Sequence, residues 1–243
     1  MSAPLLEVDG VCVRFGGLTA VDDARLSVSA GQVTGLIGPN GAGKTTLFNV
    51  ITGLQSPTSG RVLLDGEDVG GLAPQARARR GISRTFQRLE VFGSLSVFDN
   101  VLTAAELHRS WTRGAGDPRR TAQDAIDRVG VGAYATAMGD AVPTGVARLV
   151  ELARALALSP RLLLLDEPSS GLSEEETHSF AALLRELVAD GGTVLLVEHD
   201  VELVMSLCST VHVLDFGRVI CSGPPSVVQA DPAVQAAYLG VTV

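Results

Sequence analysis

Lysine is almost absent from this chain of 243 residues, whose only lysine is Lys44. Acidic side chains outnumber basic ones by 27 to 19, and the formal net charge is -8. Proteins that bind a nucleic acid backbone present a concentrated basic face, which this composition does not supply. We therefore expect no nucleic acid partner and attribute the acidic balance to a well-solvated surface.

Cysteine is also scarce, with only Cys12, Cys208 and Cys221. Their number is odd, their spacing is wide and each lies in an apolar stretch, so they indicate neither a disulfide framework nor a metal site. We expect three reduced packing residues in a reducing compartment.

Long apolar runs are missing as well. The longest apolar stretch, residues 193–216, is interrupted by ionisable side chains, which makes it unsuitable as a membrane span. These are Glu198, His199, Asp200, Glu202 and Asp215. The opening MSAPLLEVDG has no basic start, so we expect no targeting segment. The prediction is a cytosolic protein that acts at a membrane only through a partner.

The single lysine lies in GPNGAGKT, which has the spacing G-x-x-x-x-G-K-T of a phosphate-binding loop. Glycines at these positions let consecutive backbone N–H groups face phosphate oxygens, and the next helix adds its unpaired N-terminal amides. A compact ammonium fits between phosphates where a planar guanidinium would be too wide. The alternative is a Gly-rich turn that matches by chance. We expect ATP to contact Gly38, Asn40, Gly41, Ala42, Gly43, Lys44, Thr45 and Thr46, with the Thr45 hydroxyl on Mg²⁺.

The flanking segments have the order that such a loop needs. Residues 32–37 form a short apolar run between two glycines, which predicts a buried strand. Residues 45–52 carry apolar side chains at helical spacing before Gly53, which predicts a helix.

The remaining pattern predicts an α/β fold. Residues 5–35 alternate apolar and polar side chains, as in short antiparallel strands, and residues 95–158 have helical periodicity, as in a helical insert. Beyond them, alternating strands and helices predict a largely parallel sheet. We expect the further strands at 60–64, 81–86, 161–167, 192–200 and 211–223, and a helix at 174–189.

A second motif, RLLLLDE at residues 161–167, ends in two carboxylates. Four consecutive leucines predict a strand buried on both faces, and open α/β sheets bind ligands at the carboxyl ends of their strands. We expect Asp166 to hold Mg²⁺ and Glu167 to polarise the water that attacks the γ-phosphate. The alternative is a helix-capping acidic pair before Pro168.

Two polar residues follow other predicted strands. His199, in VEHD, is placed where a neutral imidazole could contact the γ-phosphate and orient the attacking water. A histidine at a strand end is more often structural, which is the alternative. Gln87, after Phe86, has a side-chain carbonyl suited to the metal or the water.

Taken in order, GPNGAGKT, RTFQ, LLLLDEP and VEHD resemble the ATP-binding cassette (ABC) family. The resemblance covers essentially the whole chain and implies one nucleotide-binding domain over 1–243. It implies a P-loop NTPase core at about 1–87 and 159–243, with an N-terminal antiparallel β-subdomain and an inserted helical subdomain at about 88–158. Phe15 would then stack on adenine, which does not select ATP over GTP. Two such subunits would enclose two ATP molecules.

Within the family, RFGGLTAV, SRTFQRLEVFGSLSVFDNV and the closing AAYLG are similar to the ATPase subunits of branched-chain amino acid importers. This similarity implies a second cassette subunit, two transmembrane permease subunits and, indirectly, an extracytoplasmic solute-binding protein. It places the chain on the cytoplasmic face of the membrane. Importers of urea or short amides and the lipopolysaccharide exporter remain alternatives, as do a soluble cassette ATPase and a nucleotide-sensing regulator.

The family signature LSGGQ is replaced here by VPTGV, residues 142–146, in which only Gly145 is kept. In the family this segment contacts the ATP bound by the opposite subunit. Pro143 cannot donate a hydrogen bond, so only backbone amides, the helix dipole and the Thr144 hydroxyl remain. Ser173, in the loop after Glu167, also departs from the family pattern. We therefore expect a functionally asymmetric pair with a different partner cassette.

In the family, a cytoplasmic helix of the permease lies beside the Gln87 loop. The side chains that could line such a groove here are Leu89, Val91, Phe92, Leu95 and Phe98; packing inside the helical subdomain is the alternative. The RARR run at residues 77–80 and the pair Arg119 and Arg120 are expected to be solvated.

Overall fold

The computed structural model describes residues 3–239 and divides into two compact units. Within the described residues, the first unit comprises 3–77 and 184–239, and the second comprises 78–183. Gly240 of the closing AAYLG lies outside the described residues. Each unit is an α/β arrangement, as the sequence predicts.

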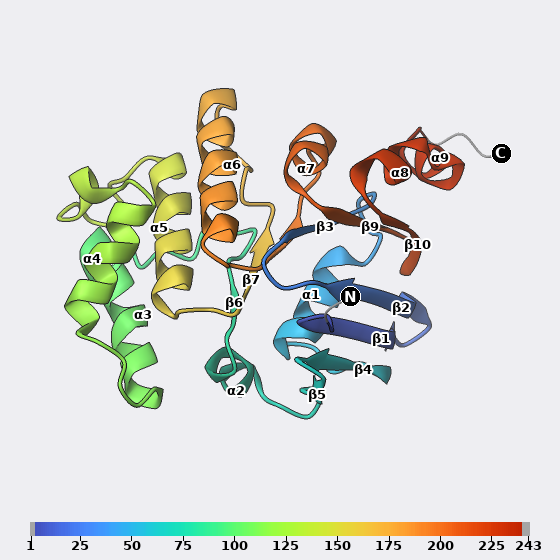
Figure 1. Cartoon of the computed structure of the whole chain (residues 1–243), viewed down its shortest axis with the longest axis horizontal. Coiled ribbons are helices and arrows are strands. Elements are labelled where there is room, and N and C mark those ends of the chain that lie inside the picture. The colour runs from blue at the N-terminus through green and yellow to red at the C-terminus, as the bar shows by residue number, and fades with distance from the viewer. Residues whose placement is uncertain (1–2, 240–243) are drawn as a thin grey trace. The chain divides into compact units, whose positions relative to one another are not determined.

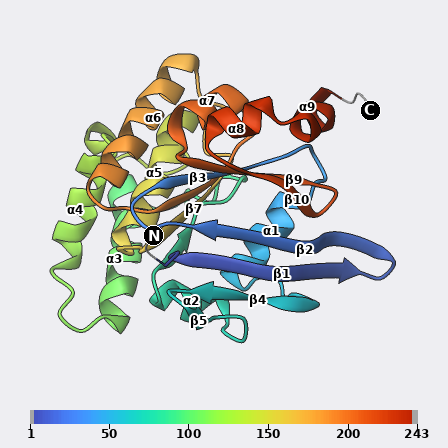
Figure 2. The same cartoon turned by 45° about the vertical axis from the view of Figure 1, so that its right-hand side comes forward.

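The first unit contains a four-stranded antiparallel sheet in the order β2-β1-β4-β5. Figure 2 shows the long strands β1 and β2 side by side, with β4 next to β1. A Cβ at Gly60 would lie 2.3 Å from the Gly10 carbonyl oxygen, so the close approach of β4 to β1 requires glycine there. The strands are β1 Leu6–Phe15, β2 Leu18–Val28, β4 Ser59–Leu64 and β5 Glu67–Asp68.

A second group of strands in this unit includes the predicted buried strand before the phosphate loop. Strand β3 is buried at all five positions and is parallel to both of its neighbours, β8 and β9. The segment at 211–223 forms two antiparallel strands, β9 and β10, joined by a turn. The strands are β3 Val33–Ile37, β8 Val194–Val197, β9 Thr210–Asp215 and β10 Arg218–Gly223; the helices are α1 Lys44–Thr52, α7 Val201–Leu207, α8 Pro225–Ala230 and α9 Pro232–Leu239.

The second unit combines one parallel strand pair with the predicted helices. Strand β7 is buried at all five positions and pairs in parallel with β6. Figure 1 shows α3, α4 and α5 packed together as a helical group. The elements are β6 Ile82–Arg84, α3 Val97–Trp111, α4 Pro118–Arg128, the short 3-10 helix Gly132–Tyr134, α5 Thr144–Ala157 and β7 Leu162–Asp166; α2 Pro74–Arg79 leads into this unit, and α6 Glu174–Ala189 begins in it and ends in the first unit.

Local sequence signals explain where these helices begin. Ser96 caps α3 by accepting a hydrogen bond from the Asp99 amide, and Asp117 caps α4 ahead of Pro118. The helices thus begin where the capping side chain replaces missing backbone partners.

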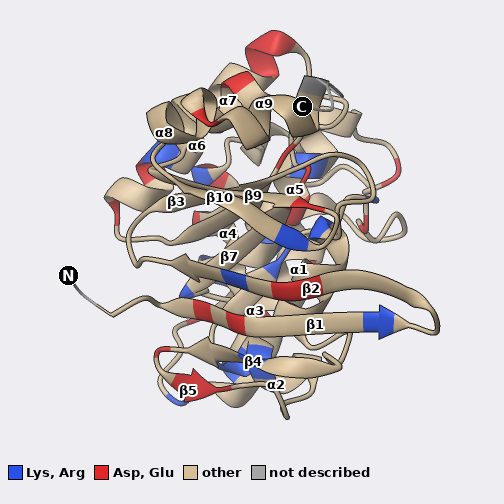
Figure 3. Ribbon diagram, turned by 90° about the vertical axis from the view of Figure 1, so that its right-hand side faces the viewer, with Lys and Arg blue, Asp and Glu red and all other residues tan. Residues whose placement is uncertain are grey.

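Charges on the antiparallel sheet are interspersed, as Figure 3 shows for β1, β2 and β4. Asp9 on β1 forms ion pairs with both Arg25 and Arg61 from the neighbouring strands. Among the described residues, no helix combines the length and the apolarity needed to cross a membrane. All three cysteines are free thiols; Cys208 is buried, whereas Cys12 and Cys221 are half-buried.

The expectation that the whole RARR run is solvated is wrong for Arg77. This side chain is only 2% exposed, because its guanidinium donates to four backbone carbonyls in the first unit. Two of them, Val50 and Ile51, lie in the last turn of α1. Arg77, which lies on α2, therefore supplies hydrogen-bond donors to carbonyl groups at the C-terminal end of α1, where the helix backbone offers few.

Candidate active site

The phosphate-loop motif lies between β3 and α1, as predicted. A Cβ at Gly38 would lie 2.0 Å from the Leu214 carbonyl oxygen, and one at Gly43 would lie 2.4 Å from that of Ala20. Backbone packing therefore requires glycine at both positions. Gly43 is also the N-cap of α1, with φ 105° and no side-chain cap, so the first amides of α1 face the loop without a capping side chain.

Lys44, the first residue of α1, is held at this loop. Its side chain is 7% exposed, and Nζ donates to the carbonyl oxygens of Gly38 at 2.6 Å and Pro39 at 3.0 Å. The ammonium thus lies over the beginning of the loop that a phosphate chain would follow. Of the other predicted contacts, Asn40, Gly41 and Thr45 are exposed, Gly43 and Thr46 are half-buried and Ala42 is buried.

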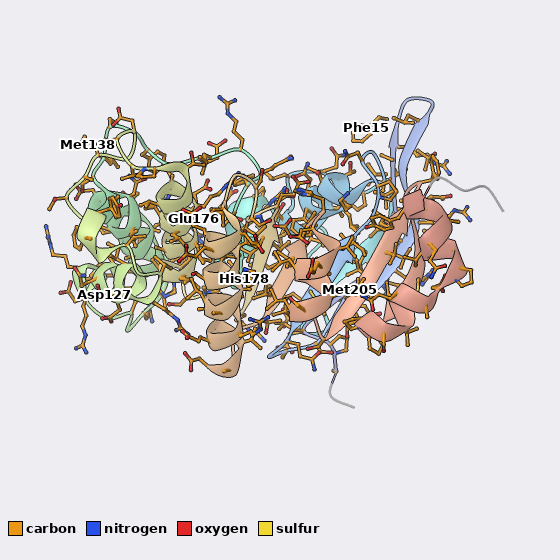
Figure 4. All side chains as sticks on the ribbon, turned by 90° about the horizontal axis from the view of Figure 1, so that it is seen from above. Phe15, Asp127, Met138, Glu176, His178 and Met205 are labelled. Atoms are coloured by element: carbon orange, nitrogen blue, oxygen red, sulfur yellow. The ribbon has the colours of Figure 1, made fainter. Side chains whose placement is uncertain are left out.

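Phe15 is the last residue of β1 and pairs with Leu18 of β2. It lies directly before the turn between the two strands, and Figure 4 labels it near the end of the β1–β2 hairpin. Its side chain is 49% exposed. An aromatic face of this size is available for stacking against a planar base.

His199 follows β8 in the first unit, and its side chain is 63% exposed. Its Nδ1 lies 3.6 Å from Oε2 of Glu198, which is fully buried and also accepts a hydrogen bond from the His199 amide at 3.2 Å. Glu198 was not among the predicted site residues, although an acid directly after a buried strand was a usable signal. Its carboxylate thus binds the His199 backbone and lies close to the imidazole.

The second unit holds the carboxylates. Asp166 ends β7 with 2% exposure and pairs with Arg84 of β6, whose Nη2 lies 2.7 Å from Asp166 Oδ2. Arg84 was not among the predicted site residues. Carboxylate, hydroxyl and amide oxygens are ligands that Mg²⁺ prefers, so Asp166, Thr45 and Gln87 fit that ion by donor type.

Glu167 adopts a backbone conformation that is rare for a residue with a side chain, with φ 47°. Such a conformation costs on the order of 1–3 kcal/mol and occurs most often at functional sites. Its Oε2 accepts a hydrogen bond from Gln87 Nε2 at 2.8 Å. The structure therefore brings together the two residues that we expect to act on the attacking water.

The altered signature begins α5. Pro143 is the N-cap and contributes no side-chain hydrogen bond, while Gly145 is buried. A Cβ at Gly145 would lie 2.4 Å from Oε1 of Glu176, the α6 residue labelled in Figure 4. Ser173 and Glu176 form a reciprocal capping pair, in which each side chain accepts a hydrogen bond from the backbone amide of the other residue. This arrangement explains Ser173 and places an acidic side chain against the signature glycine.

A cavity of about 240 Å³ lies within the second unit, beside the Gln87 loop. Its lining includes Phe86, Glu90, Phe92, Leu107 and Arg154. Of the five side chains predicted to line a groove here, Phe92 is the one that contributes to this cavity within the described residues.

Comparison with known proteins identifies the family. Residues 21–170 match the family model described as ABC transporter, and residues 218–243 match the one described as branched-chain amino acid ATP-binding cassette transporter. The chain is 40% identical to the high-affinity branched-chain amino acid transport ATP-binding protein BraF of Pseudomonas aeruginosa, over 99% of each chain. It is 32% identical to the lipopolysaccharide export system ATP-binding protein LptB of Haemophilus influenzae, over 97% of each.

A solved structure supports the same assignment. The ADP conformation of MJ1267, an ATP-binding cassette of an ABC transporter, is 28% identical, with a TM-score of 0.87 over 99% of this chain and 100% of that chain. The phosphate loop, the acidic pair after β7 and these full-length similarities agree. The chain belongs to the ABC transporter family, as one of its ATP-binding cassettes.

Proposed function

We propose that this chain is the ATP-hydrolysing motor subunit of a membrane transporter that imports branched-chain amino acids. The observation that carries the ATPase is the phosphate loop, with buried Lys44 held over it and the uncapped start of α1 behind it. The similarity to BraF and the match of the C-terminal residues to the branched-chain amino acid family support the choice of solute.

In this proposal, the loop and the acidic pair act on one nucleotide. The amides of the loop and Lys44 bind the phosphates, and Phe15 stacks on adenine. Thr45, Asp166 and Gln87 would hold Mg²⁺, which would neutralise charge on the phosphates. Glu167 accepts the proton of the attacking water.

The two polar neighbours orient this chemistry. Gln87 fixes the Glu167 carboxylate through the 2.8 Å hydrogen bond, and His199 contacts the γ-phosphate while Glu198 holds its imidazole. The rare backbone conformation of Glu167 persists only where the surrounding structure holds it, which supports a functional role for this residue.

We also propose the assembly. The core, at about 1–87 and 159–243, pairs with a second cassette subunit, and the helical subdomain, at about 88–158, contacts the permeases. Two transmembrane permeases hold the pair on the cytoplasmic face of the membrane, and an extracytoplasmic solute-binding protein delivers the solute. The cavity lined by Phe86 and Phe92 is the site on this chain for a cytoplasmic helix of a permease.

The altered signature supports an asymmetric pair. The start of α5 has Pro143 in place of a hydroxyl-bearing cap, and the Glu176 carboxylate lies against Gly145. An acidic side chain there opposes binding of a γ-phosphate from the opposite subunit. The loop and Glu167 of this chain are intact, so hydrolysis depends on its own acid and on the partner's signature.

The experiment is reconstitution of this chain with its cognate cassette, permeases and binding protein in vesicles. We expect release of phosphate from ATP and uptake of labelled leucine, isoleucine or valine. Lys44→Ala should abolish both. Uptake of urea or a short amide in their place, or no solute-stimulated ATPase, would contradict the proposed solute. Glu167→Gln should abolish turnover, whereas the matching change in the partner should have a smaller effect; equal losses would reject the asymmetry.

A further inference from the structure

Helix α5 carries three charged residues at intervals of three, Arg148, Glu151 and Arg154. Residues spaced by three lie close together along one face of a helix. Arg148 is 8% exposed and Glu151 is 5% exposed, and the two form an ion pair at 3.3 Å. Charged groups buried to this extent need partners for most of their hydrogen-bonding atoms, and both Nη atoms of Arg148 have partners, whereas its buried Nε has none among the described residues.

The partners of these side chains are backbone atoms of one short segment, residues 86–90. Arg148 donates from Nη1 to the Phe86 carbonyl oxygen at 3.0 Å and from Nη2 to that of Gln87 at 2.6 Å. The planar fork of a guanidinium matches two adjacent acceptors in a way that an ammonium does not. Arg148 therefore fixes the backbone at Gln87 itself.

The other end of the segment is held at Glu90. Its amide donates to Glu151 Oε1 at 2.6 Å, and its carbonyl oxygen accepts a hydrogen bond from Arg154 Nη1. The Arg154 guanidinium also lies 4.3 Å from the centroid of the Phe92 ring. We call Arg148, Glu151 and Arg154 together the α5 clamp, because they hold both ends of residues 86–90.

The clamp connects two parts of the site within the second unit. Thr144 and Gly145, at the start of α5, lie one helical turn before Arg148. At the other end, the Gln87 side chain donates to Glu167. The Gln87 backbone thus lies between α5 and the hydrogen bond on the Glu167 carboxylate.

We propose that Arg148 is a positioning residue, which couples the start of α5 to Glu167 by holding the backbone of Gln87. This inference rests on the proposed function, because it assigns Glu167 to ATP hydrolysis. It predicts that loss of Arg148 affects turnover through Gln87, while the loop that binds ATP in the first unit is unchanged.

The first test uses the assembled transporter with Arg148→Gln, alone and combined with Gln87→Ala. We expect Arg148→Gln to reduce kcat for ATP by on the order of tenfold to a hundredfold, as a small misplacement of a catalytic group does. The Kd for ATP should stay within about twofold of wild type. In the Gln87→Ala background the same substitution should cause no further loss, because the group that it positions is already gone.

The matched control is Arg120→Gln on α4, whose side chain is 83% exposed in a long ion pair with Asp124; its kcat should equal that of wild type. An equal loss with and without Gln87, or an unchanged kcat in Arg148→Gln, would overturn the proposal. If Arg148→Gln folds poorly because Glu151 loses its partner, Arg148→Gln with Glu151→Gln removes both charges and carries the same expectation.

The second test does not depend on hydrolysis. Hydrogen exchange of the isolated chain without nucleotide should show the Glu90 amide, which donates to the Glu151 carboxylate paired with Arg148, exchanging at least about tenfold faster in Arg148→Gln than in wild type. Unchanged exchange there would reject the clamp. Wild-type protein that shows this protection yet hydrolyses no ATP in the assembled transporter would instead contradict the proposed function.

Discussion

Replacement of Arg77 by methionine tests whether a buried arginine completes the end of the phosphate-loop helix. The guanidinium is nearly inaccessible, and it donates from Nε to Leu72 at 3.0 Å, from Nη1 to Val50 at 2.6 Å and Ile51 at 2.9 Å, and from Nη2 to Gly70 at 2.9 Å. Methionine fills a similar volume but donates no hydrogen bond. The perturbation therefore removes donors while keeping most of the packing.

The expected loss of stability follows from the four carbonyl oxygens that accept hydrogen bonds from Arg77. The Val50 oxygen also accepts a hydrogen bond from the Gly53 amide, so the substitution leaves mainly the other three oxygens without a donor. A buried acceptor that loses its donor costs roughly 1–3 kcal/mol. Part of this loss is offset because desolvation, which lowers the pKa of Arg77, no longer has to be overcome. We expect the free energy of unfolding to fall by about 3–5 kcal/mol.

The assay is urea unfolding followed by far-ultraviolet circular dichroism. A loss of this size corresponds to a midpoint shift of roughly 1 M urea or more. Arg77→Lys keeps a charge but lacks the fork, so its loss should be intermediate. Arg80→Met, at an exposed position of the same run, should change stability by at most about 0.5 kcal/mol. A loss below about 1 kcal/mol for Arg77→Met would show that the guanidinium does not stabilise the end of α1.

Three further outcomes follow from particular groups. Glu167→Gly should be more stable than Glu167→Ala by about 1–2 kcal/mol in thermal or urea unfolding, because only glycine adopts φ 47° without strain; equal stabilities would contradict this. Burial raises the pKa of the Cys208 thiol to about 12. A thiol reagent at pH 8 should therefore label Cys208 at least about tenfold more slowly than half-buried Cys12. Equal labelling rates would contradict this expectation. Burial lowers the pKa of His212 from its ordinary value of 6.5, so the unfolded chain takes up a proton that the folded chain does not. Stability should therefore fall as pH falls below about 6.5, and less steeply in His212→Gln; parallel pH profiles would disprove this.

Several features of the fold could be predicted from the sequence because they depend on neighbouring residues. The strand, glycine loop and helix around Lys44 appear as predicted, since residue spacing within one segment sets the backbone path. The four-leucine strand and the helix at residues 174–189 also match. Boundaries were less accurate where a turn intervened, as in the segment that divides into β9 and β10.

The arginines show what the sequence pattern could not reveal. A run of arginines is typical of a solvated surface. Arg77 is nevertheless buried, and it donates hydrogen bonds to backbone carbonyls as far as 27 positions away. Arg84 pairs with Asp166 across a separation of 82 positions, and Arg148 holds Gln87 across 61. Periodicity describes which face of an element is apolar, and it carries no information on which distant backbone atoms a long side chain will meet.

By itself, the sequence determined the family, the phosphate loop and the order of strands and helices, because each depends on residue types at short fixed spacings. The tertiary structure alone decided the neighbours of the reactive groups. It placed Gln87 on Glu167, Arg148 on the Gln87 backbone and Glu176 against Gly145. These contacts depend on how separate elements pack, because hydrogen-bond partners that are far apart in the chain become neighbours only when folding buries them together.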